Sequence, residues 1–336
     1  MRLFASTRHL ALLFATTIAL ICGLGGESAA ATEAMRERVR IAVVVDGSTE
    51  SSVVILRILR EQLAKLGYVE GRNLQIVERL TEGRQSRLPA MMREVAGSDV
   101  DLIITNATPA ATAAKNATSR IPIVVLGMAD PVRAGLVASL SRPGGNLTGL
   151  SMGFDQEFVG KWLELLQETI PRLRTVAVLS NPNNPMHRFL EADVIAVANQ
   201  RRLSIRLVPV AGTVDLEQGF KEARRNAQAA IVFGDAATLT DTRKVVEAAA
   251  KHHVPVMYGL GRFVESGGLI SYAPDMLDMA RRVAELADKI LKGARPSELP
   301  IEQPRRFELL VNLTAASDLG ITIPESVLVR ADRVIR

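Results

Sequence analysis

The sequence predicts an α/β protein built from two doubly wound lobes, and three observations lead to this expectation. Short apolar runs alternate with segments of helical spacing, as in a parallel sheet covered on both faces. The alternation then restarts near the middle of the chain. Finally, the stretches of sequence that begin at Asp101 and Ala229 can be aligned with each other. Each has a strand, a small polar loop, a helix and a proline that opens a buried strand, Pro122 in one and Pro255 in the other. The alternative is a coincidence of generic strand–helix units.

The first half begins with a β-branched run at Val39–Val45, which predicts a buried strand that ends at Asp46. Apolar residues at helical spacing follow it, and Gly67 marks the end of that helix. The turn at Gly144–Asn146 precedes the last short strand. The expected helices are Ser51–Leu66, Leu88–Ala96 and Pro109–Ala117, and the further strands are Asn73–Leu80, Asp101–Thr105, Ile121–Leu126 and Leu147–Leu150.

The second half repeats this alternation of strands and helices, and the order changes after Gly267-Gly268. The expected helices before that point are Phe154–Thr169, Pro185–Gln200, Asp215–Arg225 and Thr238–His252, and the strands are Thr175–Leu179, Ser204–Val210, Ala229–Phe233 and Val254–Met257. The tail predicts a strand at Leu269–Tyr272, a long helix at Pro274–Leu291, a strand-like stretch at Ile301–Val311, and helical turns at Thr314–Leu319 and Pro324–Leu328.

The connection between the halves contains no Gly/Ser-rich linker. Several ordered strands therefore join the lobes, which suits a hinge. We expect Thr148–Ser151 and Gly267–Tyr272 to be adjacent crossing strands, because each joins matched halves.

Composition excludes several classes of protein. The chain has 336 residues, enough for two or three domains or one large one, and 48% are apolar, which excludes a fully disordered chain. Aromatic residues make up only 4%, too few for a stacking surface that binds single-stranded nucleic acid. The net charge of +5 is spread along the chain, so it does not indicate nucleic-acid binding.

The first thirty-one residues have the three-part pattern of a secretory signal peptide. Arg2 and Arg8 precede the uncharged apolar run Leu10–Leu24, and small residues at 28–31 offer a cleavage site. An uncleaved membrane anchor is the alternative. The single cysteine, Cys22, lies in this segment, and Ile21 before it does not fit a lipoprotein signal. Residues 1–31 are therefore read as a signal peptide, and the mature protein is expected in the periplasm.

Familiar catalytic and cofactor motifs are absent from the sequence. Zinc has no plausible ligand set, since the mature chain has no cysteine and only His187, His252 and His253. There is no Gly-x-Ser-x-Gly, no Walker phosphate loop, and no Gly-x-Gly-x-x-Gly after the first strand. We therefore expect no enzyme activity, no metal and no cofactor.

Small polar loops follow the expected strands in both halves. In open α/β sheets ligands bind beyond the carboxyl ends of the strands, and helices that begin there offer N–H groups to an anion. The alternative for each loop is an ordinary helix cap. The candidate ligand-binding residues in these loops are Asp46, Gly47, Ser48, Thr49, Asn106, Ala107, Thr108, Asp130, Asn181, Asn183, Asn184 and Asp235.

Several strings match a known family. The longest are LAKLGYVEGRNLQI at Leu63–Ile76, TPAATAAKNATSRIPIVV at Thr108–Val125, DPVRAGLVASLSRPGGNLTGLS at Asp130–Ser151, AVLSNPNNP at Ala177–Pro185, PVMYGLGRFVESGGLISYAPD at Pro255–Asp275, and ADKILKGARPSELPIEQPRRFELLVNLTAASDLGITIP at Ala287–Pro324. Together they resemble ABC-transporter substrate-binding proteins, whose best-known members bind tryptophan or tyrosine. The resemblance implies the type I periplasmic-binding-protein fold: two Rossmann-like lobes, three crossovers, and a ligand enclosed between them.

The resemblance also bears on the site. It assigns the loops at 46–49, 106–108 and 130 to the first wall of the cleft, and 181–184, 235 and Arg262 to the second. The polar run Asp46–Ser52 replaces a bulkier stretch found in the aromatic-amino-acid binders, which favours a polar amino acid or another small carboxylate. For an amino acid, we expect Asp235 to bind the ammonium, and the N–H groups near Asn106–Thr108 to bind the carboxylate.

The resemblance therefore implies a solute-binding protein of an ABC importer, which closes on an amino acid or related small carboxylate. Its partners are a membrane permease and an ATPase on separate chains, and it is expected to be a monomer. The first lobe is expected to comprise 36–148 with 273–298, and the second 149–272 with 299–336. A sensory protein that signals to a membrane receptor is an alternative with the same fold, and an enzyme is a weaker one.

Overall fold

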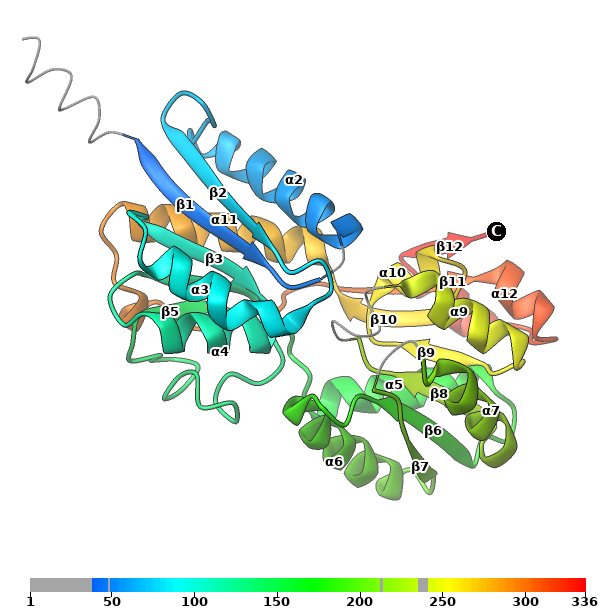
Figure 1. Cartoon of the computed structure of the whole chain (residues 1–336). Helices are drawn as coiled ribbons and strands as arrows, with labels where there is room; N and C mark the ends of the chain where they lie inside the picture. Colours follow the sequence, from blue (N-terminus) through cyan, green and yellow to red (C-terminus); the bar gives the residue numbers. More distant parts are fainter. Residues whose placement is uncertain (1–37, 48, 212–213, 235–240) are drawn as a thin grey trace, which may run out of the picture.

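The computed structural model describes residues 38–47, 49–211, 214–234 and 241–336, and these form two α/β lobes (Figure 1). The sheet of the first lobe is parallel throughout and has the strand order β2-β1-β3-β4-β5. Its strands are β1 (Val39–Val45), β2 (Leu74–Leu80), β3 (Leu102–Asn106), β4 (Ile123–Met128) and β5 (Leu147–Ser151).

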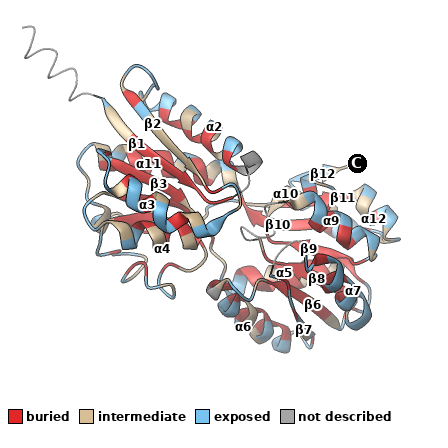
Figure 2. Ribbon diagram, viewed as in Figure 1, coloured by how far each residue is buried: buried red, intermediate tan, exposed pale blue. Residues whose placement is uncertain are grey.

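Helices cover both faces of the first sheet because its strands are apolar on both sides. The strands of this sheet are largely buried (Figure 2). In β1, Ile41 and Val43 face one core cluster, whereas Ala42 and Val44 face another. The first cluster contains α2 (Thr49–Lys65) and α11 (Met276–Leu291), and the second contains α3 (Leu88–Ala96) and α4 (Ala107–Ala117). A one-turn helix, η1 (Gln85–Arg87), leads into α3. The expected doubly wound architecture is confirmed.

The second lobe is built on a larger mixed sheet with the order β12-β11-β10-β9-β8-β6-β7. The strands are β6 (Thr175–Ser180), β7 (Ser204–Pro209), β8 (Ala229–Val232), β9 (Val256–Tyr258), β10 (Ile270–Pro274), β11 (Phe307–Asn312) and β12 (Arg333–Ile335). β10 and β11 are antiparallel. One face packs on α5 (Gln156–Thr169) and α6 (Pro185–Gln200), and the other on α7 (Leu216–Asn226), α9 (Thr242–Lys251) and α10 (Gly261–Glu265).

The chain passes between the lobes three times: after β5, after β10, and after η2 (Pro296–Glu298). Backbone bonds place the third passage between the other two. Glu302 N–H donates to Gly149 O, and Ser151 N–H donates to Glu302 O, both over 2.9 Å. On the other side, Asp275 N–H donates to Arg306 O over 3.0 Å. The three passages therefore form the connection between the lobes.

The expectation that Thr148–Ser151 and Gly267–Tyr272 are adjacent crossing strands is wrong, because the third passage lies between them. β5 pairs with β4 and bridges to Glu302, whereas β10 pairs with β9 and β11. The strand-like stretch expected at Ile301–Val311 contains two parts in the structure, the third passage and then β11. Pro304 has no N–H to continue a ladder, and β11 begins only at Phe307.

Two short elements, α10 and β12, were not expected, because five and three residues are too few for a periodic pattern. The helix expected at Thr238–His252 is described from Thr242, with 238–240 outside the described residues. The expected signal peptide also lies outside them. In the ranges given above, no helix combines the length and apolar character needed to cross a membrane.

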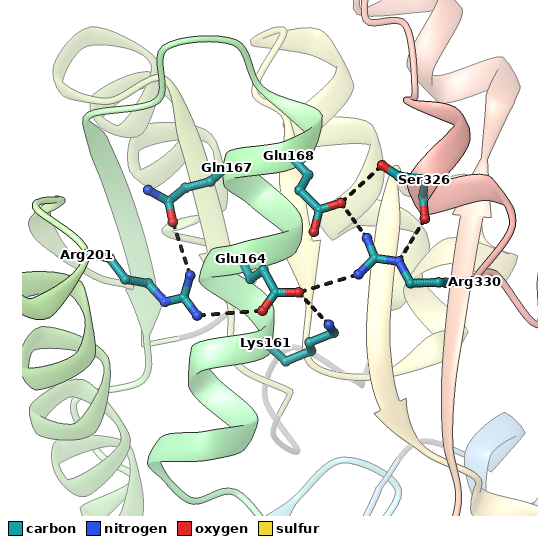
Figure 3. Close-up of polar contacts among 7 residues, drawn as sticks. All are labelled: Lys161, Glu164, Gln167, Glu168, Arg201, Ser326 and Arg330. Atoms are coloured by element: carbon teal, nitrogen blue, oxygen red, sulfur yellow. Dashed lines mark hydrogen bonds and ion pairs between the residues drawn. The ribbon is translucent and has the colours of Figure 1, made fainter.

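The C-terminal segment is held against the second lobe by charges and by buried side chains. α12 (Leu313–Asp318) and α13 (Glu325–Leu328) follow β11. Arg330 pairs with Glu168 and Glu164 on α5, and Lys161 donates to Glu164 over 2.5 Å (Figure 3). The Lys161 hydrogen bond is the main cause that holds the pKa of Glu164 below its ordinary value. Beside this network, Val327 is fully buried in the core of the second lobe.

Candidate ligand-binding cleft

A cavity lies between the two lobes, at the carboxyl ends of both sheets. The first lobe contributes residues after β1, β3 and β4, and the second contributes residues after β6, β8 and β9. This is where open α/β sheets bind ligands. The sequence-predicted residues that line it are Asp46, Asn106, Ala107, Thr108 and Asn184.

Asp46 is the polar centre of the first wall. It is 5% exposed, and its carboxylate accepts hydrogen bonds from Thr81 Oγ1 over 3.0 Å and from Gln85 Nε2 over 2.9 Å. Its backbone N–H donates to Asn106 Oδ1 over 2.8 Å, and Asn106 Nδ2 donates back to Asp46 O over 2.9 Å. These bonds tie the ends of β1, β2 and β3 together, so the carboxylate has a fixed position in the cleft.

The same pair of bonds determines how α4 meets the cavity. Because the Asn106 side chain is committed to Asp46, it does not cap α4. The first turn of α4 therefore borders the cleft without a side-chain cap, and a helix start of this kind can bind an anion through its N–H groups, although Pro109 has none. Ala107 has φ of +58°, a left-handed conformation that costs a non-glycine residue about 1 kcal/mol or more. Thr108 Oγ1 accepts the Ala129 N–H over 3.1 Å, which leaves the hydroxyl proton for another acceptor.

The second wall is formed by the start of α6. Asn184 caps this helix, and its side chain accepts the Met186 N–H over 3.1 Å. His187 is 3% exposed, and its Nδ1 accepts the Asn181 N–H over 2.8 Å, so Nε2 carries the proton of the neutral ring. Its ring meets Phe233 edge-on at 5.2 Å between centroids. This wall is therefore held rigidly by a helix cap and a buried imidazole.

The remaining lining is more apolar than the loop sequences predict. Phe154 lies at the crossing after β5, and its ring centroid is 5.0 Å from that of Phe158 and 5.6 Å from that of Trp162. Leu260 reaches from the second lobe and packs against core clusters of both lobes. The other apolar lining residues are Ile55, Pro109, Leu126, Met152, Met186, Leu190 and Met276.

Not every predicted residue lies in this cavity. Asn181 and Asn183 line an outer groove at the mouth of the cleft, together with Asn184. Gly47 lies behind Asp46, where its N–H donates to Thr81 Oγ1 over 3.1 Å. Among the described residues, Asp130 and Arg262 do not line this cavity. Ser48, Asp235 and the side chain of Thr49 fall outside the described residues.

Sequence reasoning missed several lining residues, among them Gln85, Met152, Phe154, His187 and Leu260. Met152 and Phe154 come shortly after the end of β5. They therefore also satisfy the rule that ligands bind beyond the carboxyl ends of the strands. A search for polar loops does not select them, because both side chains are apolar. Within the described residues, no group of three or more His, Cys, Asp or Glu side chains could hold a metal ion.

The chain is similar to known proteins over most of its length. The model of the family described as ABC transporter substrate binding protein matches residues 38–335. A tyrosine-binding protein from Clostridioides difficile strain R20291 is 25% identical over 246 residues, which cover 73% of this chain and 70% of the relative.

Two solved structures are similar in sequence and in fold. One is a conserved domain protein from Vibrio cholerae O1 biovar El Tor, with 28% identity, a TM-score of 0.83, and coverage of 88% of this chain and 99% of that one. The other is an ABC domain in complex with L-Trp from Streptococcus pneumonia, with 28% identity, a TM-score of 0.82, and coverage of 89% and 100%. Since the family match spans both lobes, from the first strand to the last, this chain belongs to the ABC transporter substrate binding protein family.

Proposed function

We propose that this protein is the extracytoplasmic binding subunit of an ABC importer, and that it closes its lobes on an amino acid. The observation that carries the proposal is one cavity lined from both lobes, with an uncapped helix start and a fixed carboxylate on the same wall. A ligand that touches both lobes stabilises the closed form, which a permease can then recognise.

The chemistry of the first wall suits an α-amino acid. The N–H groups at the start of α4, with the Thr108 hydroxyl, would bind the ligand carboxylate. The Asp46 carboxylate would accept the ammonium, since each of its oxygens can accept more than one hydrogen bond. Asp235, the ammonium partner expected from sequence, remains a second candidate outside the described residues.

The apolar lining then indicates the side chain of the ligand. Phe154, Met152 and Leu260 offer a surface for an aromatic or aliphatic group. Two relatives support this class, since one is named a tyrosine-binding protein and the other was solved with L-Trp. Among amino acids and related small carboxylates, we therefore propose those with large apolar side chains.

The place of the protein in the cell follows from the same proposal. Residues 1–31 would direct secretion and be removed, and the mature monomer would deliver ligand to a permease driven by a separate ATPase. The lobes would rotate about the three crossings, which lie within a few residues of the boundaries expected at 148/149, 272/273 and 298/299.

A thermal-shift screen of amino acids and small carboxylates, followed by calorimetric titration, tests the ligand class. A ligand at 100 times its Kd adds about 2.7 kcal/mol to stability, which is a clear rise in melting temperature. Thr108→Val should weaken binding by about 10- to 100-fold, because a hydrogen bond to a charged group is lost. Thr322→Val, at an exposed position outside the cleft lining, is the control and should leave affinity unchanged. If no amino acid or carboxylate raises the melting temperature, the proposed ligand class is wrong.

A further inference from the structure

Arg133 lies on the turn that follows β4, and Asp130 orients it. Asp130 Oδ1 accepts the N–H groups of Val132 and Arg133 over 3.1 and 2.9 Å. Its other oxygen, Oδ2, is 3.3 Å from Arg133 Nε. Asp130 therefore positions an arginine of the first lobe at the mouth of the cleft, where Arg133 lines the outer groove.

The guanidinium of Arg133 contacts two residues of α6, on the opposite lobe. Nη1 donates to Asp193 Oδ2 over 3.0 Å, and the guanidinium carbon is 5.5 Å from the centroid of the Phe189 ring. The Asp193 side chain is only 8% exposed. Its other oxygen accepts a hydrogen bond from Gln156 Nε2 over 3.1 Å, which holds the carboxylate in place from α5.

We propose that Arg133 and Asp193 form a latch that raises the closed fraction of the protein before any ligand binds. This inference rests on the proposed function in one respect, since it requires the lobes to open and close. The Asp130–Arg133 and Asp193–Gln156 contacts each lie within one lobe and survive opening. The Arg133 contacts to Asp193 and Phe189 cross the cleft, so only the closed form contains them.

The latch has a consequence for affinity that does not depend on ligand chemistry. When only part of the protein is competent to bind, the apparent affinity is reduced by that fraction. A contact that favours the closed form therefore strengthens the binding of every ligand by the same factor. Because the Arg133 side chain is 45% exposed, solvent screens the pair. We expect its loss to lower the closed-to-open ratio by about three- to tenfold.

The test measures the distance between the lobes in ligand-free protein. The chain after residue 31 has no cysteine, so spin labels can be attached only at introduced cysteines. Ser119 in the first lobe and Gln200 in the second are exposed positions for them. Double electron–electron resonance measures the distance between the two labels. Arg133→Gln and Asp193→Asn should each show a larger open population than the unmutated protein.

The controls separate the latch from a general effect of charge. Arg142→Gln and Asp318→Asn remove the same charges at exposed positions and should leave the distances unchanged. The double variant Arg133→Gln with Asp193→Asn should resemble Arg133→Gln, because that substitution alone removes both contacts across the cleft. Unchanged distances in Arg133→Gln, or additive effects in the double variant, would overturn the latch. A failure to bind L-tryptophan or L-tyrosine would count against the proposed ligand class, while the ligand-free distances would still decide the latch.

Discussion

Arg282 on α11 and Glu302 on the third crossing form a two-point ion pair. Arg282 Nε donates to Glu302 Oε2 over 2.7 Å, and Nη2 donates to Oε1 over 2.6 Å. Each side chain is 17% exposed. Because the backbone of Glu302 also bonds to Gly149 and Ser151, this one residue fixes the crossing to the first lobe through both its backbone and its side chain.

The first prediction concerns the pH dependence of this pair. Burial raises the pKa of the Glu302 carboxyl, but the hydrogen bonds and charge of Arg282 outweigh it and leave the pKa below its ordinary value. A lowered folded pKa stabilises the protein above the unfolded pKa of about 4.3, and this stabilisation is lost as pH falls through the folded value. Glu302→Gln should therefore lower the free energy of unfolding by about 1–3 kcal/mol at pH 7. The difference should shrink below about pH 4.

Urea unfolding of both proteins between pH 7 and pH 3 measures this difference. Glu61→Gln is the control, since Glu61 is half exposed and pairs with Arg57 along one helix. Its effect should stay below about 0.5 kcal/mol at every pH. A Glu302→Gln deficit that is equally large at pH 3 and pH 7 would show that the lost charge is not its cause.

The second prediction concerns Gly149, the β5 residue that accepts the Glu302 N–H. It has φ of +143°, and a Cβ atom there would lie 2.2 Å from Val125 O and 2.5 Å from Val125 N. Since these are backbone atoms of the neighbouring strand, they cannot rotate away. Gly149→Ala should cost about 3 kcal/mol or more, because β4 and β5 must separate.

Gly71→Ala is the matched control for Gly149→Ala. Gly71 has φ of +84°, but a Cβ atom there would have nothing within 4 Å. It should therefore lose only about 1–2 kcal/mol, the cost of the left-handed backbone. Equal losses in chemical denaturation would mean that the close approach of the strands is not what requires glycine at 149.

The sequence predicted the fold well because its signals are local and repeated. Buried strands such as Val39–Val45 and helices such as Pro185–Gln200 have strong periodicity, and the structure contains both with the expected bounds. The paths between the lobes were harder to predict. Which crossing lies beside Gly149 depends on long-range pairing, and nothing near Glu302 in the sequence specifies its partner.

The cleft was predictable only for residues whose role follows from their position after a strand. Asp46 and Asn106 were found in this way, although the bond between them belongs to the folded state. Phe154 and Leu260 are apolar, and an apolar residue in a sequence is usually read as core. The contact of Arg133 could not be predicted, because its partner, Asp193, lies sixty residues away in the sequence and on the other lobe.

The third prediction compares the two ways in which the C-terminal segment is held. Val327 is fully buried, so Val327→Ala should cost about 1–3 kcal/mol through lost packing. The Arg330 side chain is 36% exposed, so water screens its pairs with Glu164 and Glu168. Arg330→Gln should cost less than about 1 kcal/mol. If thermal or urea unfolding ranks the two variants the other way, the charges in Figure 3 are the main restraint on this segment.

The last prediction separates binding from packing among the aromatic rings near the crossings. Phe154 lines the cleft, whereas Phe307 lines a polar pocket of its own with Glu157 and Lys161. Both rings contact Phe158, with centroid distances of 5.0 and 5.2 Å. Phe154 also contacts Trp162, and Phe307 also contacts Tyr272. Phe154→Leu and Phe307→Leu should therefore lower stability by similar amounts, because each removes two aromatic contacts of about 0.5–1.5 kcal/mol apiece.

Only one of the two substitutions should change affinity. With an aromatic amino acid as ligand, Phe154→Leu removes a ring that faces the ligand side chain, and calorimetric titration should show about a tenfold weaker Kd, or about 1.4 kcal/mol. Phe307→Leu should bind as the unmutated protein does, since its ring lies outside the cleft lining. Equal losses of affinity in both variants would mean that the rings affect binding indirectly, through the connection between the lobes, and not by contact with the ligand. Unchanged affinity in Phe154→Leu would place the ligand side chain elsewhere in the cleft.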